Sequence, residues 1–203
     1  MDCSFLLIRT NFAKRSRRLD SAAFRSLAIA AIALLFGSCT RDREHQVLIS
    51  VPQQRMLVLK NGTPIGSYPV STSKFGVGDR SGSYDTPLGH LEIAGKFGAS
   101  APIGEVFKSR KPTGEVVRPD SPGRDPIVTR ILWLKGLESR NRDAYSRCIY
   151  IHGTPEERNI GKPVSFGCIR MKSSDVIDLF ETVGIGAKVD ILTTPLPQFS
   201  EKL

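Results

Sequence analysis

Glycine and proline divide this sequence into short segments of β-strand type, and that punctuation limits the folds open to the chain. Runs rich in apolar and β-branched residues are expected to form strands at 47–51, 55–60, 64–70, 88–94, 127–134, 147–152 and 187–193. The dipeptide Asn61-Gly62, between the second and third runs, is typical of a tight hairpin turn. The chain is therefore expected to be mainly β, as a sandwich or a barrel.

One late helix and one long loop complete the expected organisation. Apolar residues recur every three to four positions over about 173–183, where Ser173 or Ser174 can cap the helix and Gly184 can end it. Between 95 and 126, ten of 32 residues are glycine or proline and no period is sustained. We expect this segment to be a structureless loop beside a binding cleft, because loops of that length are usually functional or disordered.

The basic charge of the chain is concentrated at its start. The sequence has 203 residues, 29 Lys and Arg and 20 Asp and Glu, for a formal net charge of +9. The first 38 residues hold six of the basic groups and two of the acidic ones, which leaves 23 basic and 18 acidic groups in the other 165 residues. Nucleic-acid binding usually needs a clustered basic face with aromatic residues for stacking, so no nucleic-acid partner is expected.

The N-terminal segment has the form of an export signal. A cationic stretch ending at Arg25 precedes an uncharged run, 26–37, that is too short to cross a membrane and has the length of a signal-peptide core. The run leads to Cys39 and resembles a bacterial lipoprotein signal, although Phe36 stands where leucine is usual. We therefore expect 1–38 to be a signal peptide, Cys39 to be lipidated, and 39–45 to be a polar tether. An ordinary cleaved signal, or a buried helix with an incidental cysteine, are the alternatives.

An exported chain would retain two candidate thiols, Cys148 and Cys168. They could form a disulfide, or one of them could be a nucleophile. A strand over 147–152 would place Cys148 on the same face as His152 but about 13 Å away from it. Disulfide-bonded cysteines need Cα atoms within about 7 Å, so Cys148 is out of reach of Cys168 if His152 approaches that thiol. No Cys-x-x-Cys pair occurs and the histidines are far apart, so no metal site is expected.

The pair Cys168 and His152 is the arrangement that suits nucleophilic catalysis. A thiol is mostly protonated at neutral pH, so a nearby imidazole must take its proton or stabilise the thiolate, and a depressed thiol pKa is expected. Gly167 permits a tight turn that lets the backbone approach an acyl group, and the Cys168 amide could help to form an oxyanion hole. Arg170 could meet a substrate carboxylate with two parallel hydrogen bonds.

The stretch IHGTPEERNIGKPVSFGCIRMKSSDVIDLF closely resembles the signature of L,D-transpeptidases of the YkuD type. Members typically read His-Gly-Thr, then a glycine-containing spacer, then Ser-His-Gly-Cys-Ile-Arg-Met and a capped helix. The upstream stretch RMLVLKNGTPIGSYPVST and the element Thr86-Pro87-Leu88-Gly89 also resemble the family's early part. The resemblance covers about 46–193 and implies a β-sandwich of mixed sheets with one late helix and long loops, followed by a tail over 194–203.

The resemblance also implies roles for individual residues. Cys168 matches the family's acylated nucleophile, His152 its general base, and Gly153 the position whose carbonyl orients that base. The remaining motif positions, which would bind the substrate or the oxyanion, are Ser165, Gly167 and Arg170. Phe166 replaces the second histidine of the usual motif, so any function of that imidazole in other members is absent here. Because His152 matches the position of the base, activity is expected to survive this replacement, whereas the placement of the substrate near Phe166 is expected to differ.

The chemistry implied by the resemblance is acyl transfer on peptidoglycan stem peptides in cell-wall synthesis. Cys168 would attack the carbonyl between the diamino acid at stem position three and the terminal D-Ala, and an amine of another stem would resolve the thioester as a 3→3 crosslink. Water as acceptor would give an L,D-carboxypeptidase, and a protein amine would give protein anchoring. No metal or organic cofactor is needed. The expected location is the cell envelope, in the periplasm, with attachment to the membrane through a lipid.

Two other classes remain as alternatives. Ser71-Thr72-Ser73-Lys74 matches the Ser-x-x-Lys motif of penicillin-binding serine enzymes, although glycines follow it in a polar loop. The second alternative is a lipoprotein that binds peptidoglycan and has lost catalysis. The replacement of the usual histidine by Phe166 would then be a sign of that loss. Labelling of the two thiols would distinguish a cysteine enzyme from a protein that only binds peptidoglycan, because a catalytic Cys168 is expected to react faster than Cys148.

Overall fold

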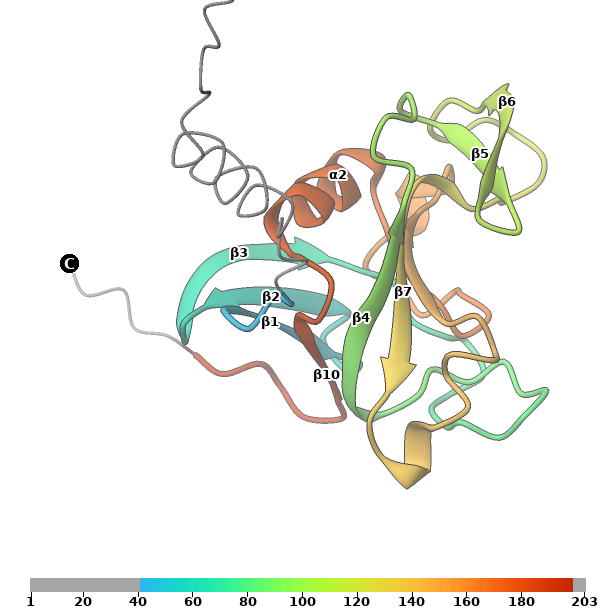
Figure 1. Cartoon of the computed structure of the whole chain (residues 1–203). Coiled ribbons are helices and arrows are strands. Elements are labelled where there is room, and N and C mark those ends of the chain that lie inside the picture. Colours follow the sequence, from blue (N-terminus) through green and yellow to red (C-terminus); the bar gives the residue numbers. More distant parts are fainter. Residues whose placement is uncertain (1–40, 199–203) are drawn as a thin grey trace, which may run out of the picture. The chain divides into compact units, whose positions relative to one another are not determined.

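Ten strands form most of the regular structure in the computed structural model, which describes residues 41–198 (Figure 1). In chain order the strands are β1 (His45–Ser50), β2 (Arg55–Lys60), β3 (Thr63–Pro69), β4 (Gly89–Phe97), β5 (Glu105–Lys108), β6 (Lys111–Val116), β7 (Val128–Gly136), β8 (Tyr150–Gly153), β9 (Ile169–Met171) and β10 (Lys188–Leu192). Two short 3₁₀ turns, Ser139–Asn141 and Glu157–Asn159, and one α-helix, α2 (Ser173–Thr182), complete the regular structure within the described residues.

The strands join into one mixed sheet in the order β3-β2-β1-β10-β4-β7-β5-β6, with β8 paired to β7 and β9 paired to β8. The pairs β1–β10 and β8–β9 are parallel, and the other neighbours are antiparallel. The β2–β3 hairpin turns at Asn61-Gly62, where both residues have positive φ as such a turn requires. The expectation of a mainly-β fold with a mixed sheet and one late helix is confirmed.

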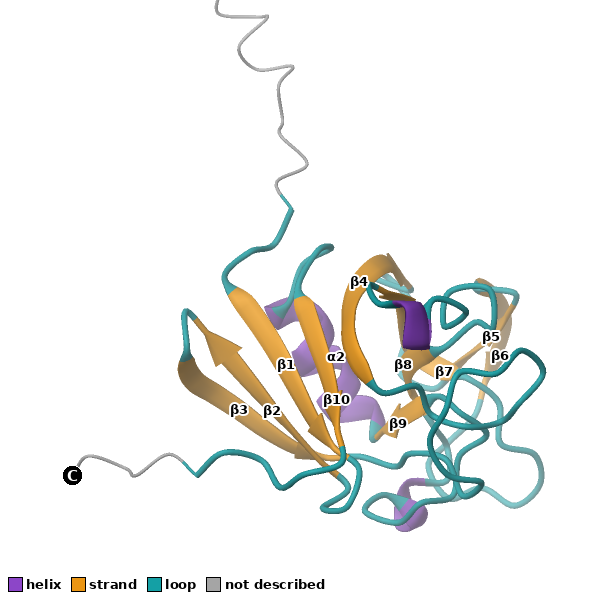
Figure 2. Cartoon of the chain, turned by 90° about the horizontal axis from the view of Figure 1, so that it is seen from below, coloured by secondary structure: helices purple, strands orange, loops and turns teal. Residues whose placement is uncertain are grey.

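Helix α2 lies on the inner side of the curved sheet, where it completes the main core (Figure 2). Its buried residues Val176, Leu179 and Phe180 belong to one apolar cluster with Ile49 of β1 and Ile151 of β8. Each such side chain contributes about 1.5–3 kcal/mol when it leaves water. This packing holds β8 and β9 against the centre of the domain. Strand β8 carries His152, and β9 begins directly after Cys168.

The expected serine cap of α2 is wrong. Lys172 occupies the N-cap position, and no side chain there caps the helix. Ser173 is already the first helical residue, and its hydroxyl is within 2.8 Å of the Thr129 hydroxyl of β7. Its amide donates instead to the Glu157 carboxylate at 2.8 Å, so a distant acidic residue satisfies the free helix terminus.

The segment 95–126 is not structureless, which corrects the loop expectation. Strand β4 continues to Phe97, and β5 and β6 form an antiparallel hairpin that leaves the body of the sheet (Figure 1). The hairpin turns at Ser109 and Arg110, both with positive φ, and not at a glycine. β6 is exposed along its whole length, so it carries no apolar alternation from which a strand could be predicted.

Part of the expected tether is packed on the domain. The Asp42 carboxylate accepts hydrogen bonds from the Gly184 amide at 2.6 Å and from the His45 amide at 3.1 Å. His45 is the first residue of β1. The signal peptide expected over 1–38 and the lipidated Cys39 lie outside the described residues, as do 199–203 of the expected tail, and the division of the chain into these parts stays a prediction.

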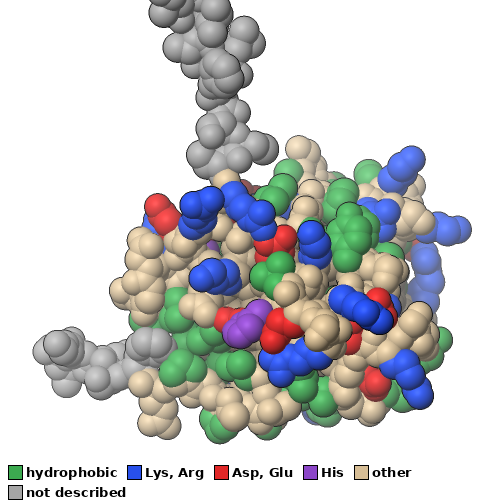
Figure 3. Space-filling view, turned by 60° about the horizontal axis from the view of Figure 1, so that its bottom comes forward, with side chains coloured by type: hydrophobic (Ala, Val, Ile, Leu, Met, Phe, Trp, Pro, Cys, Tyr) green, Lys and Arg blue, Asp and Glu red, His purple; other side chains and the backbone are tan. Residues whose placement is uncertain are grey.

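Charged side chains of both signs are interspersed with apolar ones on the face displayed in Figure 3. None of the helices in residues 41–198 has the length and apolar character needed to cross a membrane. Over the same residues, no three His, Cys, Asp or Glu side chains gather as a set of metal ligands.

Candidate active site

Strands β8 and β9 bring the two residues of the expected catalytic pair onto one face of the sheet. They run parallel, with Ile151 opposite Ile169 and His152 opposite Arg170. Side chains alternate along a strand, so His152 and Cys168 lie on the same face, one strand apart and two residues along. Cys168 directly precedes β9, and the Tyr150 amide at the start of β8 donates to Cys168 Sγ at 3.4 Å, so the thiol lies next to the start of β8.

Cys148 is not part of β8, and its expected place on the face of His152 is wrong. The strand begins only at Tyr150, and Cys148 has a φ of 56° at the end of a turn. The turn brings the Cys148 carbonyl oxygen to 3.5 Å from Cys168 Sγ. Both cysteines are free thiols, so the disulfide alternative is not realised, and the extended-strand distance estimate does not apply to this turn.

The imidazole of His152 is buried and oriented by the backbone. The ring is 4% exposed, and its Nδ1 lies 2.8 Å from the Gly153 carbonyl oxygen, which can only accept a hydrogen bond. Nδ1 therefore carries the proton and Nε2 is left with a lone pair. A Cβ at Gly153 would lie 2.7 Å from the Val128 carbonyl oxygen, so only glycine fits beside β7.

Two polar side chains, those of Ser165 and Thr86, hold the turn before Cys168 through three hydrogen bonds to its backbone. Ser165 Oγ donates to the Cys168 carbonyl oxygen at 2.6 Å and accepts from the Gly167 amide at 3.3 Å. Thr86 Oγ1 donates to the Gly167 carbonyl oxygen at 3.0 Å. Gly167 itself has a φ of 113°, a conformation that side-chain-bearing residues rarely adopt. Ser165 is fully buried, so its position suits holding the turn and not direct contact with a substrate.

Both members of the pair are electrically neutral at pH 7. Burial raises the pKa of the Cys168 thiol to about 11, against lowering contributions from the Tyr150 amide and Arg170. Burial also lowers the pKa of His152 to about 4, with the Arg170 charge acting in the same direction. The expectation of a depressed thiol pKa is wrong, because desolvation outweighs the nearby positive charge. The site holds a thiol next to a neutral imidazole and not a preformed ion pair.

Arg170 faces acidic residues of the protein. Its guanidinium lies 2.7 Å from the Asp125 carboxylate and 3.9 Å from that of Glu156, and its side chain is 10% exposed. Asp125 comes from the long segment before β7 and also accepts a hydrogen bond from the Thr154 hydroxyl. Arg170 would have to leave this pair to meet a substrate carboxylate with two hydrogen bonds, so its present geometry favours support of the β8–β9 face.

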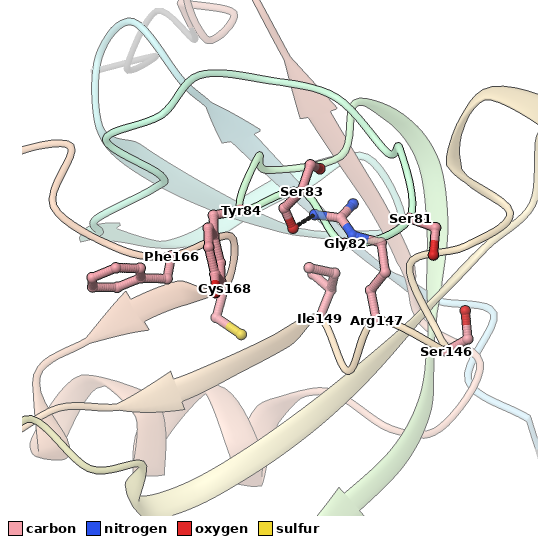
Figure 4. Close-up of a pocket in the computed structure, with 9 residues that line it drawn as sticks. All are labelled: Ser81, Gly82, Ser83, Tyr84, Ser146, Arg147, Ile149, Phe166 and Cys168. Carbon is pink, nitrogen blue, oxygen red and sulfur yellow. Dashed lines mark hydrogen bonds between the residues drawn. The ribbon is translucent and has the colours of Figure 1, made fainter.

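A cavity of about 430 Å³ opens next to the thiol (Figure 4). Figure 4 shows Phe166 on one side of Cys168 and Ile149 with Arg147 on the other, while Tyr84 lies next to the cysteine. The residues that line it are Ser81, Gly82, Ser83, Tyr84, Ser146, Arg147, Ile149, Phe166 and Cys168. Of the residues expected at the site, only Cys168 and Phe166 reach this surface. His152 is not among the residues that line the cavity.

Arg147 is a site residue that sequence reasoning missed. Its guanidinium donates to the Asp79 carboxylate at 2.6 Å and to the backbone carbonyls of Ser83 at 3.1 Å and Asp85 at 2.6 Å. It thereby fixes the loop that forms one wall of the cavity. The glycine- and serine-rich composition of 71–86 signalled a loop, but nothing local in the sequence indicates which arginine holds it.

The serine-enzyme alternative has no geometric support. Ser71 is fully buried, its hydroxyl donates to the Asn159 carbonyl oxygen at 3.0 Å, and it pairs with Arg170 through the backbone. Lys74 is exposed and lies over aromatic rings. Ser71 begins no helix, in contrast to the serine of the Ser-x-x-Lys motif.

A thiol at the wall of a cavity, with an imidazole oriented by a backbone carbonyl on a nearby strand, is an arrangement that suits nucleophilic catalysis by cysteine. The model of one protein family, described as the L,D-transpeptidase catalytic domain, matches residues 44–191. The chain belongs to this family, and the resemblance stated from its motifs is confirmed.

Proteins and solved structures with the same description are similar to this chain. The protein named L,D-transpeptidase YqjB from Bacillus subtilis is 30% identical over 155 residues, which cover 76% of this chain and 74% of that protein. L,D-transpeptidase YcfS from Escherichia coli is 41% identical over 58 residues, or 29% of this chain and 18% of that protein. A solved L,D-transpeptidase structure from Mycobacterium tuberculosis has a TM-score of 0.49 and 19% identity, covering 73% of this chain and 57% of that one.

Proposed function

We propose that this protein is a peptidoglycan L,D-transpeptidase that forms 3→3 crosslinks through a thioester on Cys168. The observation that carries the proposal is the oriented, neutral imidazole of His152 on the strand beside a thiol that opens to a cavity. The donor is a stem peptide that ends in a diamino acid and D-Ala. Membership of the L,D-transpeptidase family supports this substrate class.

The neutral states of the two groups determine how the proton moves. As Cys168 Sγ attacks the carbonyl carbon of the diamino acid, His152 Nε2 accepts the thiol proton, and the Gly153 carbonyl stabilises the resulting imidazolium through Nδ1. The carbon–nitrogen bond then breaks, and the proton passes to the D-Ala amine that leaves. An amine of a second stem attacks the thioester, gives its proton to His152, and the thiol is restored when the new amide forms.

The products formed from disaccharide-tetrapeptide test the proposal directly. A transpeptidase yields a dimer that has lost one D-Ala, which mass spectrometry resolves from substrate. A tripeptide product instead indicates water as the acceptor and an L,D-carboxypeptidase. Unchanged substrate that is nevertheless retained by the protein contradicts catalysis and supports a peptidoglycan-binding lipoprotein. Transfer to a protein amine in place of a stem amine indicates protein anchoring.

We also propose that the mature protein lies in the cell envelope and is attached to the membrane through a lipid on Cys39. The short uncharged run that ends at this cysteine supports the proposal. Cys39→Ala is expected to abolish metabolic labelling with a fatty acid and to shift the protein from the membrane fraction to another fraction. Cys3→Ala is the matched control and is expected to keep both labelling and membrane attachment. Unchanged labelling of Cys39→Ala contradicts the proposal.

A further inference from the structure

Three exposed aromatic rings meet beside the nucleophile. Phe75, Tyr84 and Phe166 are 53%, 57% and 51% exposed, and each pair of ring centroids is 5.5–5.6 Å apart. Single exposed apolar side chains are ordinary, but a contiguous group at a cavity is typical of a contact surface. Tyr84 and Phe166 also line the cavity that contains Cys168. The cluster therefore extends the wall of the candidate active site outward.

Lys74 adds a positive charge to this cluster. Its ammonium nitrogen lies 4.5 Å from the ring centroid of Phe166 and 5.1 Å from that of Phe75. Within residues 41–198 it forms no ion pair with an acidic side chain and donates no side-chain hydrogen bond. The two rings thus hold the Lys74 ammonium at the rim of the cavity, and this cation has no acidic partner in the described part of the chain.

Arg147 and Arg170, the two arginines described above, are already paired with acidic residues of the protein. Arg170 is paired with Asp125, and Arg147 bonds to Asp79 and to backbone carbonyls of the cavity wall. Lys74 is therefore better placed than either guanidinium to meet a substrate anion. Phe166 suits this arrangement, because the face of its uncharged ring attracts the Lys74 ammonium.

We propose that Lys74, Phe75, Tyr84 and Phe166 form a subsite that binds a carboxylate of the donor stem peptide outside the amide that reacts. The ammonium meets the carboxylate, and the rings cover the methylene groups beside it. This inference rests on the proposed function. The carboxylate belongs either to the residue before the diamino acid or to the side chain of the diamino acid itself.

Donor peptides with a carboxylate replaced by a carboxamide at one position at a time test the subsite. For the wild-type protein, amidation at the recognised position is expected to raise KM about fivefold with little change in kcat, which is the scale of an exposed ion pair. Amidation at the other position is expected to leave KM unchanged. The pattern identifies which of the two carboxylates is bound.

The variant Lys74→Gln is expected to raise the KM of the carboxylate donor to the KM that wild-type protein has for the amidated donor. The KM of the amidated donor itself is expected to stay unchanged. Lys74→Arg keeps the charge and is expected to retain most of the discrimination. Lys188→Gln is the matched control, because it removes an exposed lysine on β10, which β4 and β7 separate from β8 in the sheet. Phe166→Leu removes the ring under the ammonium and is expected to lower the discrimination as well.

The outcomes separate this inference from the proposed function. If both donors are turned over and Lys74→Gln changes their KM values equally, the subsite is wrong while the transpeptidase function stands. If neither donor is turned over by wild-type protein whose Cys168 still reacts with iodoacetamide, the proposed function is wrong, and the subsite with it. Circular dichroism of each variant checks that the exposed substitutions leave the fold intact.

Discussion

Replacing Cys168 with serine is expected to abolish acylation, with a loss of at least a thousandfold in rate. The side chain keeps nearly the same volume, and Ser165 and Thr86 still hold the turn through its backbone. The hydroxyl is a much weaker nucleophile than a thiol, and its more tightly held proton is harder for His152 to remove. The loss is therefore chemical and not structural.

Mass spectrometry of the intact protein after reaction with a carbapenem β-lactam measures this loss. The wild-type protein is expected to gain one adduct, located on Cys168 by peptide mapping. Cys168→Ser is expected to gain none, whereas Cys148→Ser, the matched control, is expected to gain one at the wild-type rate. An adduct on Ser71 would contradict the assignment of the nucleophile, although the buried hydroxyl of Ser71 already donates to Asn159.

Local patterns predicted the fold well because its strands are short and separated by strong turn signals. Strand β2 has the expected bounds, and the hairpin of β2 and β3 turns at Asn61-Gly62 as predicted. The hairpin of β5 and β6 was missed because exposed β6 has no alternating pattern and its turn uses Ser109 and Arg110 in place of glycine. Arg110 is held there by a hydrogen bond to the Tyr150 hydroxyl at 2.9 Å, a contact made only in the folded chain.

The motifs predicted a set of candidate site residues, but they carried no information on the electrostatics of these residues. His152 and Gly153 lie on β8, and Cys168 directly precedes β9, a strand that the sequence analysis did not predict; the structure pairs β8 with β9. The ion pair of Arg170 with Asp125 joins residues 45 positions apart, and Asp125 lies in the segment 95–126, which has no periodicity. The raised thiol pKa follows from burial, which depends on how the whole domain packs around the strand ends.

The second large effect is expected for His152→Ala, which should reduce acylation at pH 7 by about 10²–10⁴-fold. With a pKa of about 11, only about one thiol in 10⁴ is ionised at pH 7 without help. The imidazole removes the need for this ionised form, because it accepts the proton as the bond to sulfur forms. The exposed His90 provides the matched control, and His90→Ala is expected to leave the rate unchanged.

The pH dependence of kcat/KM distinguishes lost proton transfer from a distorted site. In the wild-type protein His152 must be neutral, so the rate is expected to rise as pH increases through about 4 and then to stay level well into the alkaline range. In His152→Ala the acid limb should disappear, and the residual rate should increase about tenfold per pH unit below pH 11, following the thiolate. A variant with the wild-type profile at a lower level would mean that His152 is not the base.

Stability provides an independent measure of the same buried imidazole. The pKa of His152 is about 4 when folded and 6.5 when unfolded, so between these values the unfolded chain binds more protons than the folded one. The free energy of unfolding of the wild-type protein should therefore fall as pH decreases from 6.5 to 4, by roughly 3 kcal/mol for this residue. His152→Ala should lack this contribution, although the cavity it leaves lowers its stability at every pH. Urea unfolding at pH 7 and pH 4.5 measures the difference, and equal pH slopes in both proteins would show that His152 is not buried in its neutral form.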